Sequence, residues 1–396
     1  MRFDQERARR IMSQQGIDAL VATSPDNVTY LSGYWAMSHW ARPGGPQAYA
    51  VLPAAGATPC LIAGSGNLDH VVDGESAYSE AYRYGFFATQ TDGPALSAQE
   101  AQYAKLLVDK DFGDPAEALL AALRDRKLER SRIAIEDTGI VPAIVERVKK
   151  ELPHAEIVSG GRLLRALRTI KTPEEVERLR GAVRATERGI VAALKIARPG
   201  MAERELRMEF DRTVITEGGI PVSSMCIGGG AHSAMSNCQA GERKLVAGEV
   251  IRFDGGVRYK WYRSDIARIG ALGEPGERIR SYYGALREGA ERGIAAIKPG
   301  VRTAEIFRIA METVRKVIPH YQRSHVGHGI GINNYDAPDL APQSDDVFEE
   351  GMVVCVETPY YELGWAGLQL ENTVVVRANG AELLTTLDNE LRIQKA

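Results

Sequence analysis

The sequence predicts an α/β domain over residues 1–165, followed over residues 166–396 by an α+β domain with internal pseudo-two-fold symmetry. Three observations support this prediction. The chain has 396 residues, whereas a single hydrophobic core usually stops growing at about 250–300 residues. The first part alternates short apolar runs with amphipathic stretches. The second part contains an internal repeat.

Strands and helices alternate in the N-terminal part. The predicted strands cover residues 17–22, 48–52, 60–63 and 133–135, because these runs are short and apolar. The predicted helices cover residues 97–109, 115–126 and 140–151, which have helical periodicity. This alternation is typical of an α/β domain.

A long helix is predicted at the start of the second domain. Thr172 suits the N-cap, Pro173 suits the first helical position, and Glu175 completes a capping box. The helix is therefore expected to run from residue 172 to about residue 197.

The internal repeat follows this helix. Arg198-Pro199-Gly200 with Glu205 recurs 100 residues later as Lys298-Pro299-Gly300 with Glu305. In each copy, one helix is expected to end at Pro-Gly and another to begin after it. Pro-Gly is common between helices, so chance is the alternative. Both copies precede strand-rich segments with unusual carboxylates, which favours duplication and a site where the two halves meet.

Composition argues against several classes of protein. Apolar residues make up 44% and charged residues 26%, which is ordinary for a globular protein and unlike disordered or fibrous chains. The 49 basic and 52 acidic residues nearly balance, so no nucleic acid or anionic membrane is expected as a partner. The start of the chain is charged and no run of about 18 apolar residues occurs, which predicts a cytoplasmic location. The four cysteines lack CxxC spacing and are expected to be free buried thiols.

Two aspartates flank a predicted hairpin. Asp254 ends one strand-like run and Asp265 begins the next, with the turn expected near Tyr259 and Lys260. In that register the two aspartates face each other, with Cβ atoms about 5 Å apart. Like charges repel at this distance, so the pair is expected either to share a proton or to bind a metal ion.

Two glutamates form a second predicted pair. Glu357 ends the valine-rich run 353–357, and Glu371 lies inside the apolar run 368–376. A carboxylate in such a run is costly unless it is paired or ligated. A turn around Gly364 places the two glutamates opposite one another, although Pro359 limits the first strand.

An imidazole completes the set. His328 lies in the segment 327–331, where flanking glycines allow close approach of backbone or ligand. Two Asp, two Glu and one His on separate strands suit a pair of divalent ions such as Mn, Zn, Co or Fe. Two such ions can activate water and polarise a carbonyl, which is hydrolytic chemistry.

Each acid alone is more typical of a surface strand or a salt bridge. A metal-free pair of catalytic aspartates, Asp254 and Asp265, also stays open as an alternative. Cys355 is not expected to act as a nucleophile, because no catalytic histidine and acid can be assigned to it.

At these residues the sequence resembles the creatinase and prolidase superfamily of pita-bread hydrolases, which includes Xaa-Pro aminopeptidases and dipeptidases. The resemblance spans the full length. It rests on the segments 24–34 and 170–175 and on the contexts DGG…SDIAR, GHGIG, ETPYY and QLEN.

The resemblance implies a role for each of the five residues. Asp265 and Glu371 would bridge two metal ions, Asp254 would complete one site, and His328 and Glu357 would complete the other. Glu357 would also accept a proton from water. The resemblance also implies the pita-bread fold for the second domain and a homodimer.

Several positions depart from the peptidase pattern. Asn237 and Ser324 stand where relatives have histidines, Tyr335-Asp336 replaces His-Glu, and Gln369 replaces an arginine. We therefore expect nearby groups to substitute. The candidates for catalysis beside Glu357 are His232, His325 and Tyr335, and the candidates for substrate contact are Asn237, Asp336 and Gln369. Either histidine can instead be an ordinary solvated side chain.

An aromatic segment of the N-terminal domain is a further candidate. Residues 34–42 include His39 and Trp40. In relatives that dimerise, a loop of this domain reaches the neighbouring subunit's pocket, which implies that His39 and Trp40 contact substrate. Core packing is the alternative.

The expected function is a dinuclear metal-dependent hydrolase that cleaves a C–N amide bond, most similar to Xaa-Pro dipeptidases and aminopeptidases, with a dipeptide or small molecule as its substrate. One alternative is a non-peptidase relative acting on a small osmolyte-like molecule, as creatinase, ectoine hydrolase and a dimethylsulfoniopropionate lyase do. A metal-free binding protein on the same fold is the second alternative.

Overall fold

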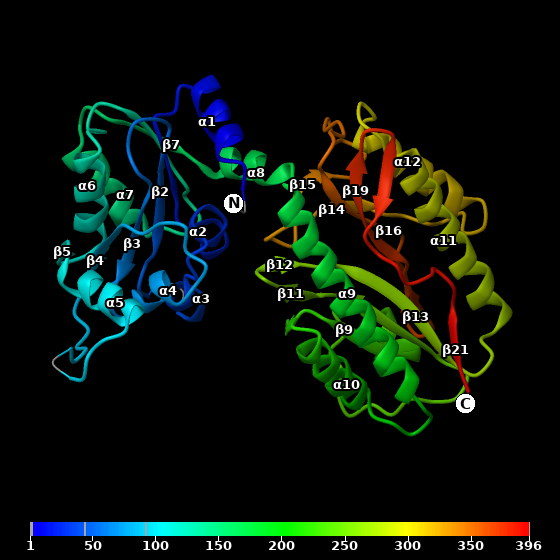
Figure 1. The fold of residues 1–396 in the computed structure, drawn as a ribbon. Coiled ribbons are helices and arrows are strands. Elements are labelled where there is room, and N and C mark those ends of the chain that lie inside the picture. Colours follow the sequence, from blue (N-terminus) through cyan, green and yellow to red (C-terminus); the bar gives the residue numbers. More distant parts are fainter. Residues whose placement is uncertain (1–2, 43–44, 92, 396) are drawn as a thin grey trace. The chain divides into compact units, whose positions relative to one another are not determined.

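The computed structural model describes residues 3–42, 45–91 and 93–395, and it divides into two compact units (Figure 1). The N-terminal unit covers Met1–Leu167 and the C-terminal unit covers Arg168–Ala396. This division lies two residues from the predicted boundary. None of the described helices combines the length and apolar composition that a membrane crossing requires.

The N-terminal unit is a seven-stranded mixed sheet with helices, in the strand order β5-β4-β3-β2-β1-β6-β7. The strands are β1 (Ala19–Ala22), β2 (Tyr49–Pro53), β3 (Cys60–Gly64), β4 (Ala81–Tyr84), β5 (Asp111–Phe112), β6 (Arg132–Ile135) and β7 (Glu156–Ser159). The helices are α1 (Gln5–Gln14), α2 (Pro25–Ser32), α3 (Met37–Ala41), α4 (Asp69–Val72), α5 (Ala98–Val108), α6 (Pro115–Asp125), α7 (Pro142–Glu151) and α8 (Gly161–Thr169).

The predicted elements of this unit are all present, with ends within two residues of those expected. The short outer strands β4, β5 and β7 were not predicted, because they are partly polar and lack a continuous apolar run. The motif that begins at Ser24 forms α2, with Ser24 as its N-cap. The buried Glu136 carboxylate accepts hydrogen bonds from the backbone N–H groups of Thr23 and Ser24 and from Asn27 Nδ2. This motif is therefore anchored inside its own unit.

The capping box predicted a long helix correctly. Helix α9 covers Pro173–Ile196, and Thr172 and Glu175 exchange backbone-to-side-chain hydrogen bonds of 2.8 and 3.2 Å. These bonds satisfy two N–H groups that a helix start would otherwise leave unpaired.

The internal repeat is a structural repeat. The pair α9 and α10 (Glu203–Thr216) is repeated by α11 (Glu277–Ala296) and α12 (Thr303–Arg315). Gly200 and Gly300 end the connections with φ of 82° and 87°, which suit glycine. Their N–H groups donate to the carbonyls of Leu245 at 2.8 Å and Phe348 at 2.9 Å. The two copies therefore share one local hydrogen-bond pattern, as the duplication predicted.

A nine-stranded sheet carries the predicted ligands, in the order β15-β14-β16-β19-β13-β10-β9, with β20 paired to β19 and β21 to β13. The strands are β9 (Cys226–Gly229), β10 (Val250–Gly255), β13 (Ile266–Leu272), β14 (Gly327–Gly329), β15 (Asp336–Asp339), β16 (Val353–Glu357), β19 (Glu371–Arg377), β20 (Gly380–Leu383) and β21 (Arg392–Gln394). The smaller sheets contain β8 (Ile220–Pro221), β11 (Val257–Tyr259) and β12 (Tyr262–Arg263), and β17 (Tyr360–Glu362) with β18 (Ala366–Leu368).

One face of this sheet packs on α11 and α12. Val354 and Val356 of β16 lie in a core cluster with Leu286 of α11 and Ile306 of α12. Because successive strand residues point to opposite faces, Glu357 points to the other face. The helices thus cover one side of the sheet and leave the other for polar side chains.

The predicted hairpin register is wrong by two residues. Asp254 pairs with Ala267 and not with Asp265, while Tyr259 pairs with Tyr262. The turn residues are therefore Lys260 and Trp261, whose φ values of 45° and 75° are those that a two-residue type I′ turn requires. A shift of two residues keeps each side chain on its original face, so the two aspartates still point the same way.

Candidate metal centre

Five acidic and imidazole side chains converge on the open face of the nine-stranded sheet. The carboxylate oxygens of Asp254, Asp265 and Glu371 lie within 4.8 Å of one another. Ligand atoms of His328, Cys355 and Glu371 also lie within 4.8 Å of one another. Glu371 belongs to both groups and therefore joins them.

Neighbouring strands place these side chains. Glu357 ends β16 and is directly paired with Glu371 at the start of β19, as predicted. Strand β14 carries His328 beside β16. A Cβ atom at Gly327 would lie 2.1 Å from the carbonyl oxygen of Cys355, and one at Gly329 would lie 2.1 Å from that of Ala337. Glycine on both sides of the histidine is therefore needed for the neighbouring backbone to pack so closely.

The hydrogen bond of His328 fixes which ring nitrogen is available. Its Nδ1 lies 3.0 Å from the carbonyl oxygen of Gly329, which can only accept, so we assign the proton to Nδ1. The lone pair of Nε2 then points towards Asp265 Oδ2 at 3.8 Å and Glu371 Oε1 at 3.9 Å. This tautomer is the one that a metal ligand needs.

The carboxylates carry more negative charge than their surroundings neutralise. Burial is the largest cause that raises the pKa of Asp254 and Asp265 to about 6 and that of Glu357 to about 7. Burial and the charges of the other three acids raise the pKa of Glu371 well above its ordinary value. Oε1 of Glu371 is also buried without a hydrogen-bond donor in the described part of the chain. Such a site fits divalent cations.

Three accessory residues lie at this centre. His325 Nδ1 is 3.2 Å from Glu357 Oε1, and burial lowers the pKa of the imidazole. The ring of Tyr335 lies 4.2 Å from that of His328. Gln369 Nε2 lies 3.2 to 3.4 Å from oxygens of three predicted ligands, namely Asp254, Glu357 and Glu371. All three residues are therefore close enough to act on groups bound there.

The structure places His232 elsewhere. Its Nδ1 lies 2.9 and 3.0 Å from the two carboxylate oxygens of Glu203, which is fully buried on α10. The contacts described for His232 do not include any of the five predicted ligands. This arrangement argues against the expected catalytic role, because the imidazole already serves as the partner of a buried carboxylate.

The substrate contact predicted for Asp336 is contradicted. The Asp336 side chain is fully buried, and its Oδ1 accepts hydrogen bonds from Nε and Nη2 of Arg168 at 2.9 and 2.7 Å. An inaccessible carboxylate cannot contact a substrate. The sequence reading failed because the ion pair joins residues that are 168 positions apart in the chain.

Replacing Asp336 with asparagine is expected to lower the free energy of unfolding of the C-terminal unit by about 3–5 kcal/mol, because the buried Arg168 guanidinium would lose the carboxylate charge that faces it. Urea denaturation followed by circular dichroism measures this loss. The exposed Asp339→Asn on the same strand is the matched control. A raised KM with unchanged stability would restore the substrate-binding role.

The remaining candidates for substrate contact are Asn237, His39 and Trp40. Asn237 is exposed on the loop after a 3₁₀ turn at Gly230–Ala234. His39 is buried in α3 of the N-terminal unit, and burial lowers the pKa of its imidazole. The side chain of Trp40 is outside the described part of the structure. Substrate contact by these residues stays a prediction.

Sequence reasoning missed several residues at the centre. Arg252 contacts Asp254, Arg323 Nη2 lies 3.7 Å from Glu357 Oε1, and Asn334 Nδ2 donates to Asp265 at 3.0 Å. Tyr361 donates to Gln369 at 3.0 Å. Of these residues, only Arg252 could have been singled out from the sequence, since it is a charged residue within the apolar strand run that starts at Val250.

The four cysteines are buried and free, as predicted.

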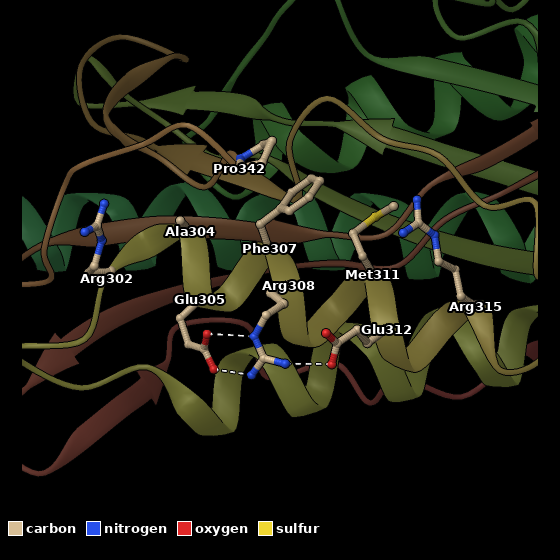
Figure 2. A pocket seen from close by; sticks show the side chains of 9 residues that line it. All are labelled: Arg302, Ala304, Glu305, Phe307, Arg308, Met311, Glu312, Arg315 and Pro342. Atoms are coloured by element: carbon tan, nitrogen blue, oxygen red, sulfur yellow. Dashed lines mark hydrogen bonds and ion pairs between the residues drawn. The ribbon is translucent and has the colours of Figure 1, made fainter.

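A separate groove of about 480 Å³ runs along α12 (Figure 2). Among its charged residues, Arg308 contacts both Glu305 and Glu312. The lining residues are Arg302, Ala304, Glu305, Phe307, Arg308, Met311, Glu312, Arg315 and Pro342. The groove shares no residue with the metal centre.

Metal removal is expected to destabilise the protein more at pH 7.5 than at pH 5. In the folded metal-free protein, the carboxyl groups of Asp265 and Glu357 have pKa values of about 6 and about 7. In the unfolded chain, the same carboxyl groups have pKa values near 4. The folded form thus binds more protons between these values, so its stability falls as pH rises through this window. Bound metal reverses the trend, because ligation needs ionised carboxylates.

Thermal unfolding of chelator-treated and metal-loaded protein at both pH values measures this effect. Metal at 100 times its Kd adds about 2.7 kcal/mol of stability. Asp265→Asn is the control and should weaken the pH dependence of the metal-free form. A metal-free form that is more stable at pH 7.5, with the same slope in the variant, would contradict the expectation.

Comparisons with known proteins agree with this geometry. The model of metallopeptidase family M24 matches residues 177–378, just over half of the chain, and the creatinase/prolidase N-terminal domain matches residues 5–170. An Xaa-Pro dipeptidase of Pyrococcus furiosus is 30% identical over 251 residues, which cover 63% of this chain and 72% of that protein. An Xaa-Pro dipeptidase of Lactobacillus helveticus is 29% identical over 76% of this chain and 84% of that protein.

Solved structures share the fold. An Xaa-Pro dipeptidase from Bacillus anthracis superposes with a TM-score of 0.79 at 24% identity, covering 98% of this chain and 99% of that chain. An X-Pro aminopeptidase from Thermotoga maritima gives the same TM-score at 23% identity, covering 98% and 100%. The two-unit architecture with a pita-bread second domain is therefore confirmed. The chain belongs to the creatinase/prolidase superfamily, within metallopeptidase family M24, and is a metal-dependent hydrolase.

Proposed function

We propose that this hydrolase is an Xaa-Pro dipeptidase that works with two divalent metal ions. One observation carries the proposal: Glu371 converges with Asp254 and Asp265 in one group of ligand atoms and with His328 and Cys355 in another, which places it between two sets of possible ligands. The names of the relatives from Pyrococcus furiosus and Lactobacillus helveticus support the substrate class.

The five residues divide into two overlapping sets. Asp265 and Glu371 would be shared by both ions, Asp254 would complete one set, and His328 and Glu357 would complete the other. A pair of divalent ions, when bound, lowers the pKa of water and polarises a carbonyl. The ionised carboxylates supply a charge of −4, which matches two divalent cations.

Glu357 is the proposed proton carrier. In the metal-free protein, burial raises the pKa of its carboxyl to about 7, so this carboxylate binds a proton more readily than an exposed glutamate does. The carboxyl can take a proton from water and return it to the leaving amine. Its Oε1 faces His325 and Arg323, and its Oε2 accepts from Gln369, so the group is held in one orientation.

His325 and Tyr335 are the proposed replacements for the accessory histidines of relatives. Burial lowers the pKa of His325, so its imidazole is neutral at pH 7 and can donate one hydrogen bond. Tyr335 is largely exposed beside His328, where its hydroxyl can reach a bound substrate. These replacements can hold the substrate carbonyl and amine.

A substrate panel tests the proposal. The protein is loaded separately with Mn, Zn, Co or Fe and given Xaa-Pro dipeptides, tripeptides with proline second, other dipeptides, creatine, ectoine and dimethylsulfoniopropionate. We expect the highest kcat/KM for Xaa-Pro dipeptides and no turnover by Asp265→Asn. Turnover confined to a small osmolyte-like molecule would favour the alternative, which the non-histidine residues Asn237 and Tyr335 support.

The same proposal includes a homodimer, on the resemblance to relatives that dimerise, and a cytoplasmic location, on the sequence composition. Sedimentation equilibrium measures the mass, which should be twice the 43.2 kDa of one chain. A monomer with full turnover would remove the dimer from the proposal without affecting the chemistry.

A further inference from the structure

Arg252 is a fully buried arginine on β10 whose guanidinium touches the metal centre. Its Nη1 donates to Oδ2 of Asp254 and, at 3.3 Å, to Oε1 of Gln369. The guanidinium carbon also lies 5.1 Å from the centre of the Tyr361 ring. This strand position therefore brings a permanent positive charge to one of the proposed ligands.

The remaining donors of Arg252 bind one loop. Nε donates to the carbonyl of Ser233 at 2.8 Å, and Nη2 donates to those of Met235 at 2.7 Å and Ser236 at 3.0 Å. Nη2 also lies 3.5 Å from Cys238 Sγ. A buried charge is costly unless its N–H groups find acceptors, and here all three guanidinium nitrogens donate hydrogen bonds. Arg252 thus connects Asp254 to the loop of residues 233–238.

Both oxygens of Asp254 are held before any ion binds. Oδ2 accepts from Arg252 and Oδ1 accepts from Gln369 Nε2 at 3.2 Å. Such partners orient a ligating carboxylate and are a common determinant of metal affinity. Because the side chains of residues 252 and 369 touch each other and the same carboxylate, a guanidinium at position 369 can reach Asp254 as well.

We propose that Arg252 is a positioning residue that holds the Asp254 carboxylate in its metal-binding orientation and ties it to loop 233–238, which carries Asn237. The inference rests on the proposed function, since it takes Asp254 as a ligand. In this chain the positive charge beside Asp254 comes from Arg252 on β10, whereas Gln369 on the neighbouring segment is neutral.

Charge exchange between the two positions tests the proposal. Arg252→Met, Arg252→Lys, Gln369→Arg and the double variant Arg252→Met with Gln369→Arg are titrated with Co(II), following visible absorption, after circular dichroism has verified the fold. We expect Co(II) to bind 10–100-fold more weakly in Arg252→Met. The Co(II) affinity of Arg252→Lys should lie between those of the unmodified protein and Arg252→Met, because one ammonium cannot reach the carboxylate and three carbonyls together. The double variant should bind Co(II) at least tenfold more tightly than Arg252→Met.

Exposed Arg302, which pairs with Asp345, supplies the control Arg302→Met, which should bind Co(II) as the unmodified protein does. A folded Arg252→Met with unchanged affinity and spectrum would overturn the inference. If that variant does not fold, unchanged affinity in Arg252→Lys, or a folded double variant without recovery, would overturn it. Failure of the unmodified protein to bind Co(II) would instead refute the proposed function.

Discussion

Replacing Glu371 with glutamine is expected to abolish metal retention and turnover together. Glu371 is the carboxylate proposed to be shared by both ions and lies among the ligand atoms of Asp254, Asp265 and His328, so a neutral amide there should weaken both proposed sites at once. We expect kcat/KM on an Xaa-Pro dipeptide to fall by more than about 10⁴-fold. Loss of the ions removes activation of water and carbonyl in addition to the roughly 10²–10⁴-fold that a general base contributes. Asp265→Asn should behave alike.

Metal content by plasma mass spectrometry and steady-state kinetics measure these losses. The metal-free Glu371→Gln protein should be at least as stable as the metal-free parent, because one member of a repelling carboxylate cluster is gone. Glu382→Gln, on the neighbouring strand β20, is the matched control, since Glu382 lies in surface ion pairs. Two ions per chain and normal turnover in Glu371→Gln would refute the shared-ligand role.

Replacing Glu357 with glutamine is expected to separate proton transfer from substrate binding. An amide oxygen can still face His325, but the side chain can no longer accept a proton. We expect kcat to fall by about 10²–10⁴-fold, which is the contribution of a positioned general base. KM should change little at saturating metal, because the residues proposed to contact the substrate are unchanged.

Kinetics over a range of metal concentrations distinguish the two roles of Glu357. A loss of kcat that excess metal restores would show that the residue acts as a ligand alone. Glu362→Gln is the matched control, because Glu362 lies on β17 and pairs with Arg278 at the surface. Its kcat should equal that of the unmodified protein.

Local signals in the sequence predicted much of the fold. The capping box at Thr172 and Glu175 predicted α9, because its two hydrogen bonds form between residues three positions apart. The repeated Pro-Gly predicted the paired helices α9–α10 and α11–α12. The pairing of Glu357 with Glu371 followed from a turn around Gly364, whose φ is 81°.

The hairpin shows where local signals fail. Tyr259 and Lys260 were expected in the turn, yet Lys260 and Trp261 occupy it with positive φ. The usual glycine or asparagine of such a turn is missing, so no local residue marks the register. The two aspartates nonetheless converge, because a shift of two residues preserves the face of a strand.

By itself, the sequence determined the candidate residues for the metal chemistry, since ligand type and strand periodicity are properties of short segments. Only the tertiary structure decided the surroundings of those residues. It buried Asp336 against Arg168, paired His232 with Glu203, and brought Arg252 onto Asp254. The physical reason is that the energy of a charged side chain depends on burial and on partners distant in the chain, which appear only when the strands assemble into a sheet.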